Sequence, residues 1–86
     1  MLSFDWDEVK ARANEQKHGV SFHEACSVFY DEVHSKVEAR YLLLGFSSLF
    51  RLLTVVHCER DQGKTIRIIS ARKASAQEAR HYVKEL

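Results

Sequence analysis

An imidazole, a carboxylate and a guanidinium lie close together in the sequence, at His57, Glu59 and Arg67. The first two groups can accept and donate protons, and the third can stabilise negative charge that develops on a phosphate. Cleavage of RNA without a metal ion needs these functions: a base for the 2′-hydroxyl, an acid for the leaving oxygen and a cation for the transition state. The three residues are therefore candidate catalytic groups, provided that the fold brings them to one surface.

A β-hairpin is predicted to hold these side chains in place. Two apolar, β-branched runs, residues 52–56 and 65–69, flank the turn-forming tripeptide at residues 61–63. If the loop has three residues, with Gly63 in the left-handed region, Arg60 pairs with Lys64. A change of one residue in the loop would move every side chain of a strand to the other face, so the site depends on this register.

The three-residue loop places His57 opposite Arg67, with Glu59 on the same face. The other face then has the character of a core and carries Leu52, Thr54, Val56, Cys58, Ile66, Ile68 and Ser70. An alternative interpretation is structural, in which Glu59 and Arg67 form a diagonal cross-strand ion pair and His57 is a half-buried spacer.

Further basic residues are candidates for binding the RNA backbone: Lys17, His18, Arg60, Lys64, Arg72 and Lys73. Arginine suits this role because it binds phosphate through two parallel hydrogen bonds. The net charge is only +1, but residues 1–39 carry four basic and eight acidic side chains, whereas residues 60–86 carry seven basic and three acidic ones. This imbalance favours a polyanion at the C-terminal half and a basic partner at the N-terminal half, and a solvated surface of mixed charge is the alternative.

The sequence predicts neither a metal nor a cofactor. No glycine-rich loop precedes a helix, so a nucleotide site is not indicated. His23 and Cys26 are spaced at i and i+3, but Cys26 falls on an apolar helix stripe, and structural zinc needs four ligands at tight spacing. His57 and Cys58 are neighbours in a strand and point to opposite faces, which argues against a cysteine–histidine nucleophile pair.

Length and composition are those of a single globular domain over residues 1–86. Cys26 and Cys58 are too few for a disulfide framework and fit a reducing compartment, so we expect a cytoplasmic protein. No apolar run is long enough to span a membrane, and no basic start precedes an apolar block. Neither an anchor nor a signal peptide is therefore expected.

The first helix is predicted between a cap at Asp5 or Asp7 and a left-handed stop at Gly19, and it should run to about Lys17. A short extended segment at residues 3–6 precedes it as a predicted edge strand. One row of this helix, with the spacing i, i+4 and i+7, is formed by Lys10, Asn14 and Lys17.

Two capping boxes predict two more helices, one starting at Ser21 with Glu24 and one at Ser75 with Glu78. The second helix should cover residues 22–29, and its buried stripe is formed by Phe22, Ala25, Cys26 and Phe29. The apolar stripe of the last helix, with Tyr82 beside it, is formed by Ala76, Ala79, Val83 and Leu86.

Three strands are predicted between these helices, at residues 39–46, 51–60 and 64–72, and the polar residues 30–36 predict a loop. The fold class is therefore α+β, with two N-terminal helices, an antiparallel β-meander and a C-terminal helix against the sheet.

Two groups of motifs resemble a known family over nearly the whole chain. The N-terminal group is Phe4-Asp-Trp-Asp-x-x-Lys10, Asn14-x-x-Lys17-His-Gly-Val-Ser-Phe22-x-x-Ala25 and Val28-Phe29-x-Asp31. The C-terminal group is Glu59-Arg60, Ile66-Arg-Ile-Ile-Ser-Ala-Arg-Lys-Ala74 and Glu78-x-Arg80-x-Tyr82. Together they resemble the BrnT family, the ribonuclease toxins of BrnT/BrnA type II toxin–antitoxin systems. The sequence departs from the family pattern at Glu32, where proline is frequent.

The resemblance implies a RelE-like fold and cleavage of messenger RNA that arrests translation. It also implies a BrnA-like antitoxin with a ribbon–helix–helix domain, and a complex that represses its own operon, so that operator DNA is bound only through the antitoxin. The face bearing His57, Glu59 and Arg67 is then the expected RNA site. The alternative is a catalytically inert homologue that only docks the antitoxin and modulates operator binding.

Overall fold

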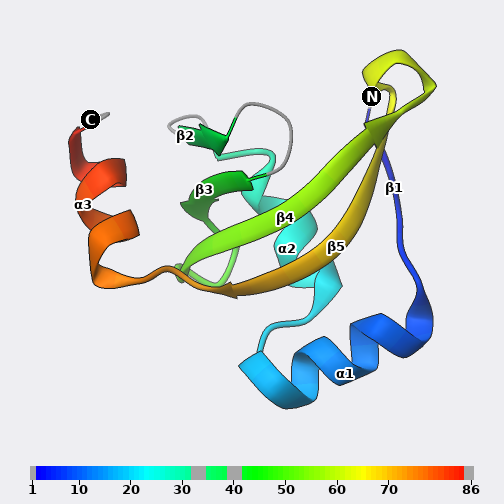
Figure 1. The fold of residues 1–86 in the computed structure, drawn as a ribbon, viewed down its shortest axis with the longest axis horizontal. Helices are drawn as coiled ribbons and strands as arrows, with labels where there is room; N and C mark the ends of the chain where they lie inside the picture. The colour runs from blue at the N-terminus through cyan, green and yellow to red at the C-terminus, as the bar shows by residue number, and fades with distance from the viewer. Residues whose placement is uncertain (1, 32–34, 39–41, 85–86) are drawn as a thin grey trace.

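The computed structural model describes residues 2–31, 35–38 and 42–84 of the chain. Within them a five-stranded sheet has the order β1-β5-β4-β3-β2, and helices flank it (Figure 1). Strands β2 to β5 form an antiparallel meander, and β1 pairs with β5 in parallel. The predicted α+β arrangement and the predicted N-terminal edge strand are confirmed. The elements are β1 (Ser3–Asp5), α1 (Glu8–His18), α2 (Phe22–Val28), β2 (Ser35–Glu38), β3 (Leu42–Phe46), β4 (Leu52–Arg60), β5 (Thr65–Lys73) and α3 (Ala76–Lys84).

Helix α1 begins and ends at residues predicted for its caps. The carboxylate of Asp7 accepts hydrogen bonds from the backbone N–H of Val9 at 2.8 Å and of Lys10 at 3.2 Å. Gly19 adopts a φ of 69°, and its N–H donates to the carbonyl of Glu15 at 2.8 Å. Because glycine enters the left-handed region without steric cost, the helix ends there and the chain turns toward α2.

Helix α2 covers one face of the sheet, which we call the inner face (Figure 1). Its side chains Phe22, Ala25 and Val28 are buried, and the Ser21 hydroxyl caps it as predicted. They pack against apolar side chains of β3, β4 and β5, namely Leu43, Leu53, Val55, Ile66, Ile68 and Ala71. Cys26 and Phe29, which were predicted on the buried stripe, lie half-buried at the border of this core.

Helix α3 starts with the predicted capping box. The Ser75 hydroxyl accepts from the N–H of Glu78 at 3.1 Å, and the N–H of Ser75 donates to the Glu78 carboxylate at 2.8 Å. The predicted apolar stripe is wrong, because Val83 is 63% exposed whereas Tyr82 is only 4% exposed. Leu86, also predicted on that stripe, lies outside the described residues.

Tyr82 determines which side of α3 faces the sheet. Its ring meets that of Phe46 edge to face, with centroids 5.3 Å apart, and its hydroxyl donates to the Asp31 carboxylate at 2.9 Å. Burial, together with Asp31, raises the pKa of Tyr82 to about 12. A buried tyrosine needs a partner for its hydroxyl, so this pairing overrides the simpler stripe of small apolar residues.

The strand pattern before β4 differs in part from the prediction. Ser35–Glu38 forms strand β2 at the edge of the sheet, where residues 30–36 had predicted a loop. Leu42–Phe46 forms β3 as expected, whereas the predicted strand residues 39–41 lie outside the described residues. A polar segment can serve as an edge strand because only one of its sides is paired.

The loop between β4 and β5 has four residues rather than the predicted three. Arg60 pairs with Thr65, which leaves residues 61–64 in the loop, so Lys64 is not the partner of Arg60. Gly63 does adopt the predicted left-handed conformation, with a φ of 86°. The additional residue shifts the pairing by one position, and a shift of one position exchanges the two faces of a strand.

The predicted juxtaposition of His57 and Arg67 is therefore wrong. His57 pairs with Ile68 and lies on the inner face, where it is 3% exposed. Arg67 pairs with Cys58 on the opposite face, which we call the outer face. The predicted core face of β4 is also wrong, because the residues that β4 presents to α2 are Leu53, Val55 and His57.

A β-bulge in β5 changes which of its residues face the core. Val56 pairs with Ser70 and His57 pairs with Ile68, so Ile69 lies between the pairs and is 42% exposed. The extra residue lets Ile68 and Ala71 both face the core, although an uninterrupted strand would place them on opposite faces.

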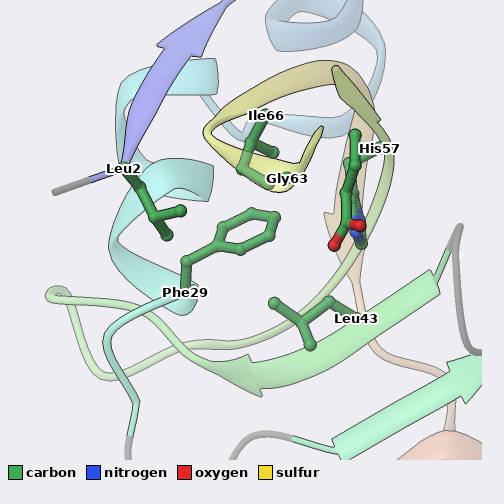
Figure 2. A pocket seen from close by; sticks show the side chains of 7 residues that line it. Leu2, Phe29, Leu43, His57, Gly63 and Ile66 are labelled. Carbon is green, nitrogen blue, oxygen red and sulfur yellow. The ribbon is translucent and has the colours of Figure 1, made fainter. Parts of the chain in front are cut away.

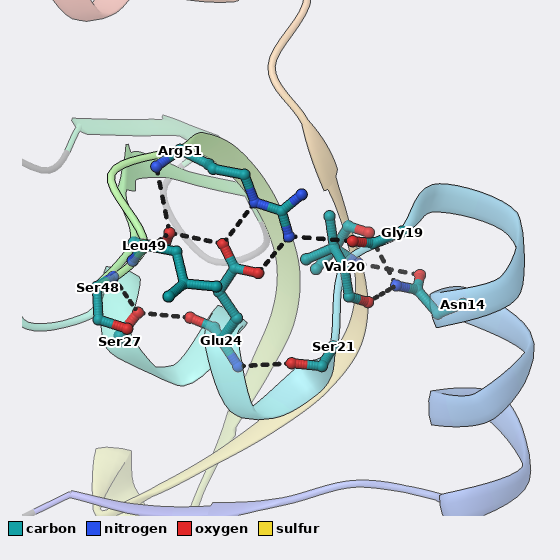
Figure 3. A network of polar contacts seen from close by, with 11 residues as sticks. Asn14, Gly19, Val20, Ser21, Glu24, Ser27, Ser48, Leu49 and Arg51 are labelled. Carbon is teal, nitrogen blue, oxygen red and sulfur yellow. Dashed lines mark hydrogen bonds and ion pairs between the residues drawn. The ribbon is translucent and has the colours of Figure 1, made fainter.

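A buried ion pair joins α2 to the loop between β3 and β4 (Figure 3). The Glu24 carboxylate accepts from Nε of Arg51 at 2.9 Å and from the hydroxyl of Ser47 at 2.6 Å, and it forms an ion pair with a terminal nitrogen of Arg51. Arg51 also donates to the carbonyl of Gly19 at 3.0 Å. The hydrogen bond from Arg51 lowers the pKa of Glu24, so this carboxylate stays ionised at neutral pH.

Glu24→Gln should lower the free energy of unfolding by about 2 kcal/mol, because an amide cannot accept both Arg51 hydrogen bonds and leaves the guanidinium without its counter-charge. Urea denaturation followed by circular dichroism measures the change. Glu15→Gln, on the exposed side of α1, is the matched control and should change the free energy by less than about 0.5 kcal/mol. Equal losses in both variants would show that the buried pair adds no stability.

Candidate functional site

His57 and Glu59 line a small pocket beside the hairpin loop, which we call the tip pocket (Figure 2). They occupy alternate positions of β4, so both side chains lie on the inner side. The pocket has a volume of about 160 Å³, and its other lining residues are Leu2, Phe29, Leu43, Gly63 and Ile66. No lysine or arginine is among these described lining residues, so the tip pocket lacks the cations that most often bind a phosphate.

Arg67 and Arg72 lie on the outer face of β5, and each meets a carboxylate. Arg67 is 3.4 Å from Asp5 of β1, a long contact between two partly exposed groups that contributes little stability. Arg72 forms two hydrogen bonds with Glu78 of α3, at 2.7 and 2.8 Å. The hydroxyl of Thr54 in β4 donates a hydrogen bond to the same carboxylate at 2.9 Å. Arg72 is thus held in a structural pair, whereas Arg67 is held loosely.

A second cavity, the basic cleft, lies between α1 and the bulge of β5. Its volume is about 270 Å³, and its lining residues are Lys10, Ala13, Asn14, Lys17, His18, Ile69 and Ser70. Lys10 and Lys17 are exposed and His18 is half-buried. Two of the predicted RNA-binding residues, Lys17 and His18, therefore share one surface with a further lysine.

Asn14 holds α1 against β5. In the described chain β1 pairs with β5 only at residues 65–67, so Ala71 lies beyond that pairing. Asn14 Nδ2 donates to the carbonyl of Ala71 at 2.8 Å, and the N–H of Ala71 donates to Asn14 Oδ1 at 3.2 Å. The carboxamide thus pairs with the strand edge as another strand would, and it also donates to the carbonyl of Val20 at 3.0 Å. These bonds place the basic residues on either side of Asn14 along the edge of β5.

Arg67 lies near the start of α1. The pKa of Asp7 is lowered first by hydrogen bonds from the backbone of Lys10 and Val9, and further by the positive charges of Lys10 and Arg67. One carboxylate thus lies within the electrostatic influence of both cations. Arg67, which pairs with Asp5 just before α1, is therefore on the α1 side of β5, although neither Arg67 nor His57 is among the lining residues of the basic cleft.

The other predicted RNA-binding residues lie elsewhere. Arg60 and Lys64 are exposed at the two ends of the hairpin loop. Lys73 is exposed at the end of β5, where its charge contributes to the lowered pKa of Glu24. The basic cleft thus contains two of the six predicted RNA-binding residues, Lys17 and His18.

Sequence reasoning did not assign Lys10, Asn14 and Ser70 to a site. The helical row of Lys10, Asn14 and Lys17 was a usable signal, because it places two lysines and an amide on one side of the helix, where they can contact another element. Ser70 carried no such signal, since its side of the strand depends on the bulge.

The described part of the chain contains no metal-binding cluster, and the Cys26 thiol is not of the reactive kind. Within residues 2–31, 35–38 and 42–84, no three histidine, cysteine, aspartate or glutamate side chains gather closely enough to hold a metal ion. Burial raises the pKa of the Cys26 thiol to about 11, so this thiol stays protonated at neutral pH.

No helix within the described ranges is long and apolar enough to cross a membrane.

The fold and the cleft define a small α+β protein with a basic surface suited to a phosphate backbone. Residues 6–78 match the family described as "Ribonuclease toxin, BrnT, of type II toxin-antitoxin system". The chain therefore belongs to the BrnT family of ribonuclease toxins, as its motifs had indicated.

A solved structure supports the fold. The chain is similar to the crystal structure of the Brucella abortus ribonuclease toxin BrnT, with a TM-score of 0.66 and 22% sequence identity over 87% of this chain and 99% of that chain. At this identity the likeness establishes the architecture. No curated protein matches the sequence.

The pair of Arg72 and Glu78 predicts a pH dependence of stability. Hydrogen bonds from Arg72 lower the pKa of Glu78 from 4.5 to about 2. A carboxyl group with a lowered pKa stabilises the fold above its unfolded pKa, and this contribution is lost as the pH falls through the folded pKa. The difference in the free energy of unfolding between wild type and Glu78→Gln should therefore be largest above about pH 5, at roughly 1–2 kcal/mol.

This difference should shrink as the pH falls from 4.5 toward about 2, and urea denaturation at a series of pH values measures it. Gln77→Glu, at the neighbouring exposed position, is a control for the effect of helix charge. A difference that stays constant across this range would show that the ion pair does not contribute.

Proposed function

We propose that this chain cleaves RNA at the basic cleft and acts as a toxin that a protein antitoxin neutralises. The observation that supports this most is the match of residues 6–78 to the ribonuclease toxin family. Two of the stretches that carry the resemblance, residues 14–25 and 66–74, also meet at this cleft through the hydrogen bonds of Asn14 with Ala71. Cleavage of messenger RNA would arrest translation.

The basic cleft offers the groups that metal-independent cleavage needs. His18 is suited to take the proton of the 2′-hydroxyl, since imidazole is the side chain best matched to proton transfer near neutral pH. The freed oxygen attacks the phosphorus, a cyclic 2′,3′-phosphate forms, and the 5′-oxygen leaves with a proton that Lys17 can donate. Lys10 and Arg67 supply positive charge for the phosphate, and Arg67 can exchange its loose contact with Asp5 for it.

His57 and Glu59 have no part in this proton transfer. Both lie on the inner side of β4, whereas Arg67 lies on the outer face of β5, so one phosphate cannot contact all three. The proposed site keeps Lys17, His18 and Arg67 from the sequence prediction and adds Lys10.

A BrnA-like antitoxin with a ribbon–helix–helix domain is the proposed partner. The family description places its members in type II systems, in which a second protein inhibits the toxin. An inhibitor that covers the basic cleft should present acidic side chains to Lys10 and Lys17. Operator DNA would be bound only through the antitoxin, and both free cysteines fit action in the cytoplasm.

A catalytically inert homologue that only docks the antitoxin is the second candidate. The observation that favours it is that Arg67 and Arg72 each meet a carboxylate, which would occupy two cations that RNA could use. Induced expression without the antitoxin separates the two functions. Growth arrest with cleaved RNA supports the ribonuclease, and normal growth with intact RNA supports the inert homologue.

His18→Ala should lower the rate of RNA cleavage about a hundredfold, because it removes a proton-transfer group. Lys17→Ala should also lower it about a hundredfold, because it removes the proposed proton donor together with a positive charge. Arg12→Ala is the matched control, since Arg12 is an exposed cation of the same helix outside the basic cleft. Cleavage of a labelled RNA by purified, antitoxin-free protein measures each rate. Full activity in a folded His18→Ala variant would place the chemistry elsewhere.

Cleavage should persist in EDTA, because side chains of the basic cleft supply both the proton transfers and the positive charge. The products should end in a 2′,3′-cyclic phosphate or its hydrolysis product, which end-group analysis of the RNA fragments detects. An enzyme that stops in EDTA and recovers when Mg²⁺ is added would contradict this mechanism.

A further inference from the structure

We propose that the tip pocket binds a guanine base of single-stranded RNA and that Glu59 is the residue that recognises it. The inference rests on the proposed function, since it takes RNA as the substrate. It gives the tip pocket a role in choosing the RNA, while the basic cleft cuts it.

The walls of the tip pocket suit the faces of a flat ring. Leu2, Phe29, Leu43 and Ile66 come from four different parts of the chain and converge on one space (Figure 2). Proteins that read single-stranded RNA commonly bind splayed bases against aromatic and apolar side chains. The volume of about 160 Å³ is below that of sites for drug-sized ligands, so the pocket suits one base rather than a larger molecule.

Glu59 determines which hydrogen-bonding groups the pocket favours on a ligand. It is the charged side chain among the described lining residues, and it is exposed. In the part of the chain that the structure describes, its carboxylate accepts no hydrogen bond and forms no ion pair. A carboxylate has two acceptor oxygens and no donor. A base that binds here is therefore favoured when it presents N–H donors, and two adjacent donors would use both oxygens.

Guanine is the base that meets this requirement. Its Watson–Crick edge carries the ring N1–H and the exocyclic amino group side by side, so both can donate to one carboxylate. Adenine and cytosine place a ring nitrogen acceptor beside their amino group, and uracil places its N–H between two carbonyls. Each of these three bases would set an acceptor against Glu59, which is unfavourable.

The surroundings of the tip pocket suit an RNA strand. Arg60 and Lys64 are exposed at the two ends of the hairpin loop, where they can hold the phosphates beside a bound base. The tip pocket and the basic cleft share no lining residue. The recognised base and the cleaved bond therefore belong to different positions of one strand.

Binding of GMP, AMP, CMP and UMP to the purified chain tests base recognition separately from cleavage. All four nucleotides share the ribose and the phosphate, so any contact of these groups with the basic cleft is the same for each. A difference in affinity between the nucleotides therefore reports on the base. GMP should bind at least about tenfold more tightly than the others in calorimetry. It should also shift the methyl NMR signals of Leu43 and Ile66.

Glu59→Gln should abolish the preference for GMP, because the carboxamide replaces one acceptor oxygen by a donor. The exposed Glu59 makes no contact that the fold needs, so the variant should melt at the wild-type temperature. Glu15→Gln carries the same change on exposed α1 and should keep the preference.

Equal binding of the four nucleotides overturns the proposal, and so does a GMP preference that survives in Glu59→Gln. A GMP preference that Glu59→Gln removes supports it, even for a chain that cuts no RNA, in which case only the proposed function fails. Cleavage by a chain without base preference leaves the proposed function standing and overturns base recognition at the tip pocket.

Discussion

The register between β4 and β5 is the constraint on which both surfaces of this protein depend. The four-residue loop turns His57 and Glu59 toward the side covered by α2 and leaves Arg67 on the other side. The bulge at Ile69 then returns Ala71 to the core. Because side chains alternate along a strand, these two local features decide which polar groups share a surface. The loop and the bulge together produce the two surfaces, the tip pocket and the basic cleft.

The carboxamide of Asn14 is the second determinant of the basic cleft. It meets the backbone of Ala71 with one donor and one acceptor, and it reaches Val20 with its other donor hydrogen. A buried amide that satisfied fewer of these groups would destabilise the protein, so α1 has little freedom to shift along β5. The same contact that stabilises the fold therefore orients Lys10 and Lys17.

The basic residues fall into two groups: those held in ion pairs within the fold, and those exposed and able to contact a ligand. Arg51 and Arg72 form multiple hydrogen bonds with Glu24 and Glu78. The first pair joins α2 to the loop between β3 and β4, and the second joins α3 to β5. The lysines of the basic cleft are exposed on α1 instead. Catalysis by charge needs cations that are oriented but not neutralised, and this contrast supports the proposal of an RNA site at the basic cleft rather than at Arg72.

The sequence by itself determined the helix boundaries, the main hairpin strands and the family. The caps at Asp7, Ser21 and Ser75 and the stop at Gly19 were predictable, because each acts on backbone groups a few residues away. Tertiary structure decided the site. Three- and four-residue loops contain the same turn-forming residues yet give opposite faces, and the contact between residues 14 and 71 joins segments far apart in the chain. A site assembled across such distances depends on pairing and packing that no short sequence pattern encodes.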